Sequence, residues 1–490
     1  MQLHPSWWRA VLADSALIPV PLSPEGLPDL DSHQIPEQGT DDMWLLIAPA
    51  NSHLCPDFVE VLRGHAMRRP EVGIFYADEV ETLNGGTRKQ QLKPAMNLLL
   101  QLADDYVGSP VMVLHSVFNL LGGFRHDAHS AVIYDFILRA AHAGISIERI
   151  PKVMVAHAGR RPRALVQDRR GAVVDWIDAT GKPLDLDSGL TAATLQLRRH
   201  FSSYPSVTVV IATRQARARQ LPEGQAGAPH IINLLDGLSH IDWPMQSIKV
   251  LIGDDIPDDS IYSGRIFPFD IRRIDTRRSS DAPFSYAAKM NSLWRQATTN
   301  YIVFINDDVL VRDAGWLRAL MTFAMEDDVG GVGARLLFGD GRLQHAGIAG
   351  GLCGSCVHAW IFAPAHERTY NDWALVHREW SMVTGAVFAT RREVLEQVNG
   401  FDERFSLEYN DVDLCLRMRL HGYKIVYTPF AEMIHYERAS RGGALPRADQ
   451  VAMFLKRWEE VLKSDPAFNP GFDMSNVYVD PAHMRQVWFK

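Results

Sequence analysis

The sequence predicts an α/β protein whose main sheet is mostly parallel, with helices on both faces. Three runs of β-branched and apolar residues carry this prediction: VTVVIAT (207–213), KVLIGDD (249–255) and YIVFINDD (301–308). Continuous apolar runs of this length are typical of parallel strands that are buried on both faces. Between the second and third runs, SYAAKMNSLWRQA (285–297) has the spacing of a helix, which completes a strand–helix–strand unit.

Further elements follow toward the C-terminus. The pattern predicts strands at GVGARLLF (331–338), TGAVFATRR (384–392) and YKIVY (423–427), and a helix from about Asp411 to Leu420. In sheets of this class, ligands bind beyond the carboxyl ends of the strands. Asp254 and the pair Asp307–Asp308 stand at two such ends, so we expect a ligand site there.

The length and charge of the chain limit its function. A chain of 490 residues is longer than one hydrophobic core usually spans, which predicts two or three domains. A formal charge of −8 argues against a nucleic-acid binder, because such proteins need a basic face to displace counterions. The first residues do not resemble a signal peptide, and no apolar stretch approaches the roughly 20 residues that span a bilayer. We therefore expect a cytoplasmic protein, at most peripherally associated with the inner face of the cytoplasmic membrane.

The four cysteines are too few for a disulfide framework, which fits a reducing compartment. Cys353 and Cys356, with His358 nearby, have the spacing of half a zinc site, but no second pair follows. We expect buried thiols in preference to zinc.

The chain contains an internal repeat. The segment DFILR (135–139) matches DLCLR (413–417), and GGFR (122–125) resembles NGFDER (399–404). At the same offset of 278 residues, three further landmarks match: Gly144 with Gly422, Pro151 with Pro429, and His157 with His435. We interpret residues 41–160 as a partial copy of the later module.

The two copies differ in their acidic residues. Asp411 corresponds to Ile133, and WLLIAPANSHL (44–54), the counterpart of YIVFINDDVLV, contains no carboxylate. The first copy is therefore expected to be degenerate and non-catalytic. The predicted organisation is a degenerate domain at 1–160, a connector at 161–205, a catalytic domain at 206–445, and a C-terminal helix and tail at 446–490.

Asn306-Asp307-Asp308 places two repelling carboxylates at a strand end. A bound divalent cation usually offsets such repulsion, since Mg²⁺ and Mn²⁺ prefer oxygen ligands and often bridge carboxylates to substrate phosphates. The alternative is a solvated turn, for which Asn-Asp-Asp is also a common composition.

Several motifs in order resemble the family-2 inverting glycosyltransferases, with the rhamnosyltransferase-like enzymes of bacterial surface polysaccharides as the nearest type. The motifs are NDD (306–308), GVGARLLFGDGRLQHAG (331–347), MVTGAVFATRREV (382–394), NGFDERF (399–405), YNDVDLCLRMRLHGY (409–423) and HYERASRG (435–442). The resemblance implies a GT-A fold, Mn²⁺ or Mg²⁺, and a nucleotide-diphosphate sugar as donor, UDP- or dTDP-linked. It also implies a saccharide, lipid-linked saccharide or protein as acceptor.

The resemblance assigns the donor side residue by residue. It implies metal ligands at Asn306, Asp308 and His435, and it places Asp307, which lies between the first two, among the residues that bind the donor. It places Asp254 at the nucleobase and Thr213 and Arg214 beside base and ribose. It places Lys289 and Asn291 near the diphosphate, and Arg438 and Arg441 on a segment that closes over the anionic donor. For His435, Lys289 and Asn291 the alternative is an ordinary structural position.

The resemblance also implies that Asp411 is the catalytic base, with Asn410 and Trp380 toward the acceptor. An inverting transfer needs one base to take the proton of the acceptor hydroxyl. A carboxylate at the start of a helix is also favoured by the helix dipole alone, and an aromatic residue at 380 is as often core. Asp413 recurs as Asp135 in the first copy, whereas Asp411 does not recur, which favours Asp411 as the functional residue.

Two other enzyme classes lack their motifs. A sugar nucleotidyltransferase would need a glycine-rich loop after residue 213, and a nicotinamide dehydrogenase would need GxGxxG there. A non-catalytic sugar-binding or scaffold protein is the remaining alternative, and the carboxylates of the second module argue against it. The sugar, the nucleobase, the acceptor and the linkage are not readable from the sequence.

Overall fold

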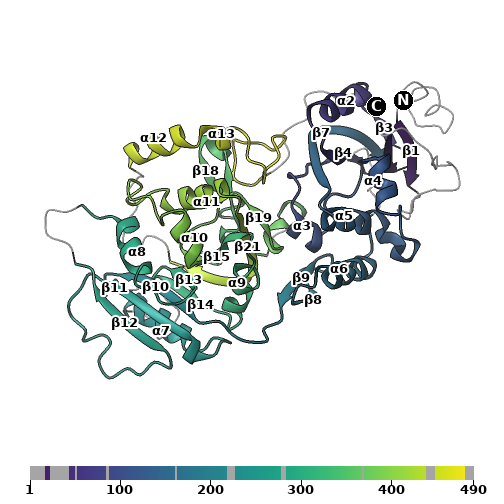
Figure 1. Ribbon diagram of the computed structural model, residues 1–490. Coiled ribbons are helices and arrows are strands. Elements are labelled where there is room, and N and C mark those ends of the chain that lie inside the picture. Colours follow the sequence, from purple (N-terminus) through teal and green to yellow (C-terminus); the bar gives the residue numbers. More distant parts are fainter. Residues whose placement is uncertain are drawn as a thin grey trace. The chain divides into compact units, whose positions relative to one another are not determined.

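The computed structural model describes residues 17–22, 43–49, 52–83, 88–159, 163–217, 227–277, 283–366, 369–436 and 447–479. The chain divides into two compact units (Figure 1). Unit 1 comprises Met1–Gln196, Pro466–Asp473 and Asp480–Lys490, and unit 2 comprises Leu197–Asp465 and Met474–Val479. Within the described ranges, no helix combines the length and the apolar character needed to cross a membrane.

Unit 2 is built on a large sheet whose main path runs β12-β11-β10-β13-β20-β15-β21-β14, with β16 beside β15 and β19 beside β21. Its strands are β10 (Val207–Thr213), β11 (Ile248–Asp254), β12 (Asp270–Asp275), β13 (Tyr301–Ile305), β14 (Val309–Val311), β15 (Val329–Leu337), β16 (Leu343–His345), β19 (Arg378–Trp380), β20 (Val387–Arg391) and β21 (Lys424–His435).

The mostly parallel sheet expected from the sequence holds only for half of this sheet. From β12 to β13 all neighbours are parallel. Beyond β13, strand β20 runs antiparallel between β13 and β15, and only β15 and β21 are parallel to each other. The sheet is therefore mixed, because an apolar run is equally compatible with a buried strand of either direction.

Several helices pack against the sheet of unit 2. The described helices of this unit are α7 (His230–Leu238), α8 (Tyr286–Trp294), α9 (Trp316–Ala324), α10 (Arg392–Gln397), α11 (Asn410–Leu420), α12 (Ala448–Arg457) and α13 (Glu459–Lys463). Every residue of β15 is buried, so side chains on both of its faces are covered. Its glycines allow close packing, since a Cβ on Gly331 would lie 2.1 Å from Phe388 and one on Gly333 would lie 2.6 Å from Val383.

The smaller elements of unit 2 are β17 (Ile348–Gly350), β18 (Cys356–His358), and the 3₁₀ turns η2 (Met245–Ser247), η3 (Leu352–Gly354) and η4 (Tyr370–Leu375). Strands β17 and β18 form a short hairpin.

Unit 1 contains a second sheet with the order β1-β2-β6-β4-β7-β3, and β5 beside β4. Its elements are β1 (Leu17–Leu22), β2 (Trp44–Pro49), β3 (Ser52–Leu54), α2 (Phe58–Arg68), β4 (Val72–Thr82), β5 (Arg88–Gln91), α3 (Leu98–Ala103), β6 (Val111–Leu114), α4 (His115–Leu120), η1 (His126–Ala131), α5 (Val132–His142), β7 (Ser146–Ala158) and α6 (Val166–Thr180). Strands β8 (Leu184–Ser188) and β9 (Leu195–Arg199) follow.

The two sheets have the same strand order and the same strand directions. The path β1-β2-β6-β4-β7-β3 matches β10-β13-β20-β15-β21-β14, with neighbours parallel, antiparallel, antiparallel, parallel and antiparallel in both units. This match agrees with the repeat in the sequence. That unit 1 is a degenerate glycosyltransferase copy stays a prediction.

A buried ion pair repeats in both units. In unit 2, Arg417 donates from Nε to Asp413 at 2.7 Å and from its terminal nitrogens to the carbonyls of Val398 and Gly400. In unit 1, Arg139 does the same with Asp135, Leu121 and Gly123. Each guanidinium ties a glycine-containing turn to the helix that follows, so this Asp–Arg motif has a structural role.

Residues 161–205, expected as a connector, contain a packed helix. Helix α6 lies against α5 and η1 of unit 1. It buries Ala172, Val173, Trp176 and Ile177, which recur at helical spacing and form an apolar stripe. The expected C-terminal tail also contributes to unit 1, because Asn469 donates to both carboxylate oxygens of Asp78 at 2.9 and 3.0 Å.

We predict that Arg417→Met destabilises the protein strongly, because it leaves the fully buried Asp413 short of its main partner and two carbonyls without a donor. Breaking one side of a buried ion pair costs about 3–5 kcal/mol, so unfolding monitored in urea should shift clearly. Arg404→Met is the control, because its pair with Asp402 is exposed on the arginine side. Equal stability of both variants would contradict the structural role.

Candidate active site

Polar side chains meet at the carboxyl ends of β10, β11 and β13, as the sequence predicted. Thr213 and Asp254 are register partners at the ends of β10 and β11. The hydroxyl of Thr213 donates to Asp307 Oδ2 at 2.7 Å, which connects these strand ends to the segment after β13. The expected edge of the sheet therefore gathers three of the predicted donor-side residues.

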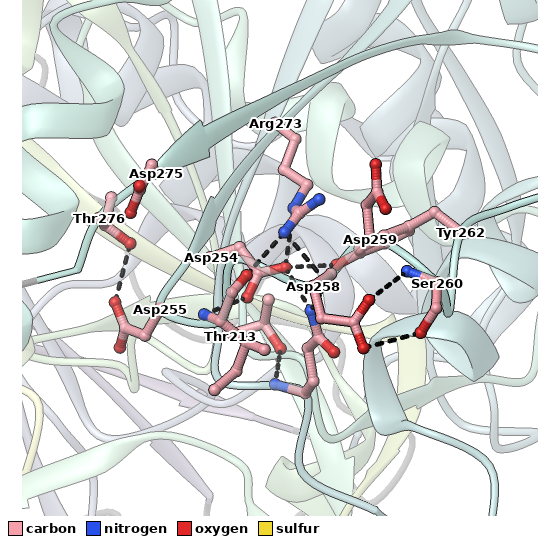
Figure 2. A network of polar contacts seen from close by, with 12 residues as sticks. Thr213, Asp254, Asp255, Asp258, Asp259, Ser260, Tyr262, Arg273, Asp275 and Thr276 are labelled. Atoms are coloured by element: carbon pink, nitrogen blue, oxygen red, sulfur yellow. Dashed lines mark hydrogen bonds and ion pairs between the residues drawn. The ribbon is translucent and has the colours of Figure 1, made fainter.

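Asp254 lies at the centre of the network in Figure 2. Its Oδ2 accepts hydrogen bonds from Gln215 Nε2, the Tyr262 hydroxyl and Arg273 Nε, each at 3.0 Å. Its Oδ1 accepts from the backbone N–H of Ile256. The carboxylate is buried, and three of its four protein donors crowd Oδ2, so a nucleobase could be accepted at Oδ2 only if one of these donors leaves.

Arg273 and Tyr262 hold this arrangement together. The guanidinium of Arg273 lies 5.1 Å from the ring centroid of Tyr262 and also donates to the carbonyls of Ile256 and Asp258. Burial and the neighbouring Asp254 raise the pKa of Tyr262, so its hydroxyl remains a donor. The loop after β11 is thereby closed over Asp254.

Lys289 lies beside the same strand ends. Its ammonium is 2.9 Å from Asp255 Oδ1 and donates to the carbonyl of Thr213 at 3.2 Å. Burial lowers the pKa of Lys289, although Asp255 opposes the shift. Arg214 follows Thr213 directly and is exposed.

The metal ligands implied by the resemblance lie together. His435 Nε2 is 3.1 Å from Asp308 Oδ1 and 3.3 Å from Asn306 Nδ2. On its other side, His435 Nδ1 is 2.8 Å from Gln344 Oε1. Because that amide oxygen accepts a hydrogen bond, Nδ1 carries a proton, and Nε2, at hydrogen-bond distance from Asp308, donates to that carboxylate when the ring is protonated. In the neutral ring with the proton on Nδ1, Nε2 could instead ligate a cation.

The two adjacent carboxylates titrate differently. Burial and the charge of Asp308 raise the pKa of Asp307 to about 7. Burial opposes ionisation of Asp308 as well, but His435 lowers its pKa overall. Asp308 is therefore the permanently ionised member of the pair.

These residues fit a hard divalent cation that also needs a substrate. Among the residues that the structure describes, no three His, Cys, Asp or Glu side chains are placed to hold a metal ion by themselves. Mg²⁺ and Mn²⁺ typically use one or two protein carboxylates and complete their shell with water and substrate phosphates. Asp308, His435 and Asn306 could supply such a partial set.

Asp411 stands at the start of α11 with a well-defined orientation. Its Oδ2 accepts from the backbone N–H of Gly385 at 2.7 Å and from the Thr384 hydroxyl at 3.3 Å. A Cβ on Gly385 would lie 3.0 Å from the Cβ of Asp411, so glycine permits this approach. The backbone N–H of Asn306 donates to the carbonyl of Ala386, the next residue, at 2.9 Å. Segment 384–386 therefore contacts both the candidate base and the candidate metal ligands.

Three predicted site residues have structural roles instead. Asn291 donates to Phe401 O and Glu403 and accepts from Trp294 and the Phe401 N–H, so its amide is fully used within the protein. Trp380 is completely buried and its ring lies against Trp360 and Arg378, so it cannot face an acceptor. The amide of Asn410 is buried and donates to the carbonyl of Leu407. Arg438 and Arg441 lie outside the described residues.

The cysteine prediction is right only in part. Cys55 and Cys415 are buried, whereas Cys353 is exposed on a short turn and Cys356 is half-buried. Cys353 has a left-handed backbone, with φ of 51°, which holds it on the surface side of this turn.

Sequence reasoning missed several residues of the site. Tyr286 donates to Asn306 Oδ1 at 3.1 Å, and Gln344 orients His435. Tyr286 belongs to the FSYAAKMN motif and lies one helical turn before Lys289, which is a signal that could have found it. No such signal marks Gln215, Tyr262 and Arg273. They meet their shared partner Asp254 only in the folded chain.

Two curated relatives match most of this chain. The uncharacterized protein y4gI of Sinorhizobium fredii is 30% identical over 434 residues, which cover 84% of this chain and 46% of the relative. The O-antigen biosynthesis protein RfbC of Myxococcus xanthus is 29% identical over 426 residues, which cover 82% of this chain and 32% of the relative. The chain thus spans about a third to a half of the length of these relatives.

Among solved structures, the mannosyltransferase PcManGT from Pyrobaculum calidifontis, in complex with GDP-Man and Mn²⁺, is similar at 17% identity and a TM-score of 0.34. The match covers 55% of this chain and 68% of that chain. This similarity is too weak to support an inference about fold or ligand.

The family described as Glycosyltransferase like family 2 matches residues 205–458, slightly more than half of the chain. The matched range includes β10, the NDD segment, Asp411 and His435, and it ends close to the C-terminal boundary of the main part of unit 2. The chain therefore belongs to the glycosyltransferase-like family 2.

Proposed function

We propose that this chain is an inverting, metal-dependent glycosyltransferase of GT-A type that moves a sugar from a nucleotide-diphosphate sugar to an acceptor hydroxyl. One observation carries the proposal: segment 384–386 binds Asp411 on one side and the backbone of Asn306 on the other. Asp411, which is suited to act as a base, thus lies close to the segment suited to hold a metal–diphosphate. A displacement at the anomeric carbon needs both groups near the reacting atoms.

The donor side would be formed by the strand ends of unit 2. Asp308 and His435, with Asn306, would hold Mn²⁺ or Mg²⁺, and the bound ion would stabilise the charge on the departing diphosphate. Lys289 brings a buried cation to the same edge of the sheet. Thr213, Arg214 and Asp254 would lie toward the nucleoside, with the loop over Asp254 opening to admit the base.

Asp411 would act as the base. In the reaction, an acceptor oxygen attacks the anomeric carbon while the bond from that carbon to the diphosphate oxygen breaks, and the hydroxyl proton passes to the Asp411 carboxylate. Gly385 and Thr384 hold Oδ2 of this carboxylate in place. Fixing the base in advance lowers the cost of reaching the reactive geometry.

The biological setting is inferred from the relatives. RfbC is an O-antigen biosynthesis protein by name, which supports a role for this chain in bacterial surface polysaccharide or glycoconjugate synthesis. The nearest type in the sequence motifs is rhamnosyltransferase-like, and we propose a saccharide or lipid-linked saccharide as acceptor. A cytoplasmic location follows from the cytoplasmic pool of nucleotide sugars that such an enzyme needs.

We predict that Asp411→Asn reduces transfer by about 10²–10⁴-fold, the usual contribution of general-base catalysis, while donor binding stays near wild type. The donor is first found by screening nucleotide sugars with Mn²⁺ for thermal stabilisation, since a ligand of the native state raises the melting temperature. Release of nucleoside diphosphate then measures turnover. Asp449→Asn is the control, because Asp449 is exposed and pairs only locally with Arg447. Turnover of Asp411→Asn at the wild-type rate would contradict the proposal that Asp411 is the base.

We predict that Asp308→Ala weakens Mn²⁺ binding at least tenfold, because it removes the ionised carboxylate beside His435. Calorimetric titration of Mn²⁺ in the presence of the identified nucleotide sugar measures the affinity. Asp313→Ala, a few residues along the chain on the exposed turn after β14, should leave it unchanged. An unaltered titration of Asp308→Ala would place the metal elsewhere.

We predict that Gly385→Ala lowers turnover about tenfold or more without changing Mn²⁺ affinity, because the new methyl carbon would lie 3.0 Å from the Cβ of Asp411 and push that residue away. Gly171→Ala in α6 is the matched control, since nothing lies within 4 Å of a Cβ there. Steady-state rates and the same metal titration separate the two effects. A loss of metal affinity in Gly385→Ala would show that the segment acts on the donor side instead.

A further inference from the structure

His230, the first residue of α7, is a buried polar side chain without a visible partner. Its side chain is almost fully buried, and Nε2 makes no hydrogen bond with the part of the chain that the structure describes. Leaving such an atom unpaired is unfavourable, and unpaired buried polar atoms in folded proteins call for an explanation.

The surroundings of His230 are those of the candidate metal site. The charges of Asp308 and His435 both act on its imidazole. Its ring centroid lies 6.1 Å from that of Tyr436, whose backbone N–H donates to the carbonyl of Asp308 at 3.0 Å. Helix α7 also lies against β14, the strand that begins directly after Asp308.

A second buried histidine, His377, differs from His230 in its surroundings. His377 is also buried with unpaired ring nitrogens, but its neighbours are the rings of Phe323 and Phe430. Burial alone lowers the pKa of His377, with no charged group acting on the ring among the described residues. At His230 the charges of Asp308 and His435, which suit a divalent cation, act on the ring, so a polar ligand is expected to enter.

The position of His230 favours an anionic ligand, which accepts a hydrogen bond. The side chain is buried and Nε2 has no partner among the described residues, and an imidazole can donate from Nε2 in one of its two neutral tautomers as well as when it is protonated. Direct metal ligation is not supported, since no group of three His, Cys, Asp or Glu within the described ranges is placed to share an ion. The positive end of the α7 dipole also favours an anion over a cation at this position.

We propose that His230 donates a hydrogen bond from Nε2 to a phosphate oxygen of the donor's diphosphate, next to the cation held by Asp308 and His435. The proposal rests on the proposed function and adds a diphosphate-binding residue to it. His230 thereby helps to fix the leaving group on the side of the site where α7 lies against β14.

The test uses inorganic pyrophosphate with Mn²⁺ as the probe, because it contains the diphosphate and needs no knowledge of the nucleobase or sugar. Calorimetry on the full chain compares wild type with His230→Phe, which keeps the ring shape without an N–H, and with His230→Gln, which keeps a donor. His377→Phe is the matched control. Mn²⁺ alone is titrated in parallel, and melting temperatures show that each variant is folded.

We expect His230→Phe to weaken Mn²⁺–pyrophosphate binding about tenfold, the factor that corresponds to roughly 1.4 kcal/mol for one hydrogen bond to a charged acceptor. His230→Gln should retain most of the affinity, and His377→Phe should equal wild type. Mn²⁺ alone should bind equally to all four proteins.

Unchanged pyrophosphate binding in His230→Phe overturns this inference and leaves the proposed function intact. A loss of binding to Mn²⁺ alone in His230→Phe also overturns it, because the residue would then act on the ion. If wild type binds neither Mn²⁺–pyrophosphate nor any nucleotide sugar, the proposed function fails together with the inference.

Discussion

The backbone of residues 384–386 is the constraint on which the candidate site depends. The antiparallel pairing of β20 with β13 places Val387 opposite Ile305, so the residue before β20 meets the residue after β13. Asn306 therefore donates to Ala386, while Gly385 one residue earlier donates to Asp411. The first of these bonds joins two backbones and the second joins a backbone N–H to the Asp411 carboxylate, so the strand register fixes the backbone to which both the base and the metal-ligand segment are attached.

Units 1 and 2 show how the same fold can carry different charges. In unit 2, His435 Nε2 lies 3.1 Å from Asp308, and no lysine among the described residues forms an ion pair with that carboxylate. In unit 1, the corresponding His157 faces Glu79 at 3.1 Å, and the ammonium of Lys93 lies 3.3 Å from the same carboxylate. All three side chains are buried, so unit 1 neutralises its carboxylate with its own lysine. The charge that unit 2 offers to a ligand is thus satisfied internally in unit 1, which is consistent with the predicted absence of catalysis there.

Motif residues near a site are not all site residues. Asn291 lies in a helix two residues from Lys289, yet its amide holds the turn at Phe401. Trp380 lies close in sequence to Thr384, yet its ring belongs to the core. In both cases the side chain stabilises the elements that carry Lys289 and Asp411. A family motif can therefore contain residues that maintain the fold and do not contact a ligand. The tertiary structure separates structural residues from ligand-binding residues, because it shows which hydrogen-bonding atoms already have a protein partner.

The sequence by itself determined the positions of the main strands, the repeat, the family, and the residue types at the strand ends, since apolar periodicity and local motifs are properties of short segments. It did not determine the direction of β20, the packing of α6, the hydrogen-bond partners of Asp254, or the packing of His230 beside Tyr436. Each of these depends on contacts between residues far apart along the chain, such as Asp254 with Arg273 or Asn306 with His435. Local pattern carries no information on such pairings, because the same apolar strand can be buried beside different neighbours, and only tertiary packing selects among them.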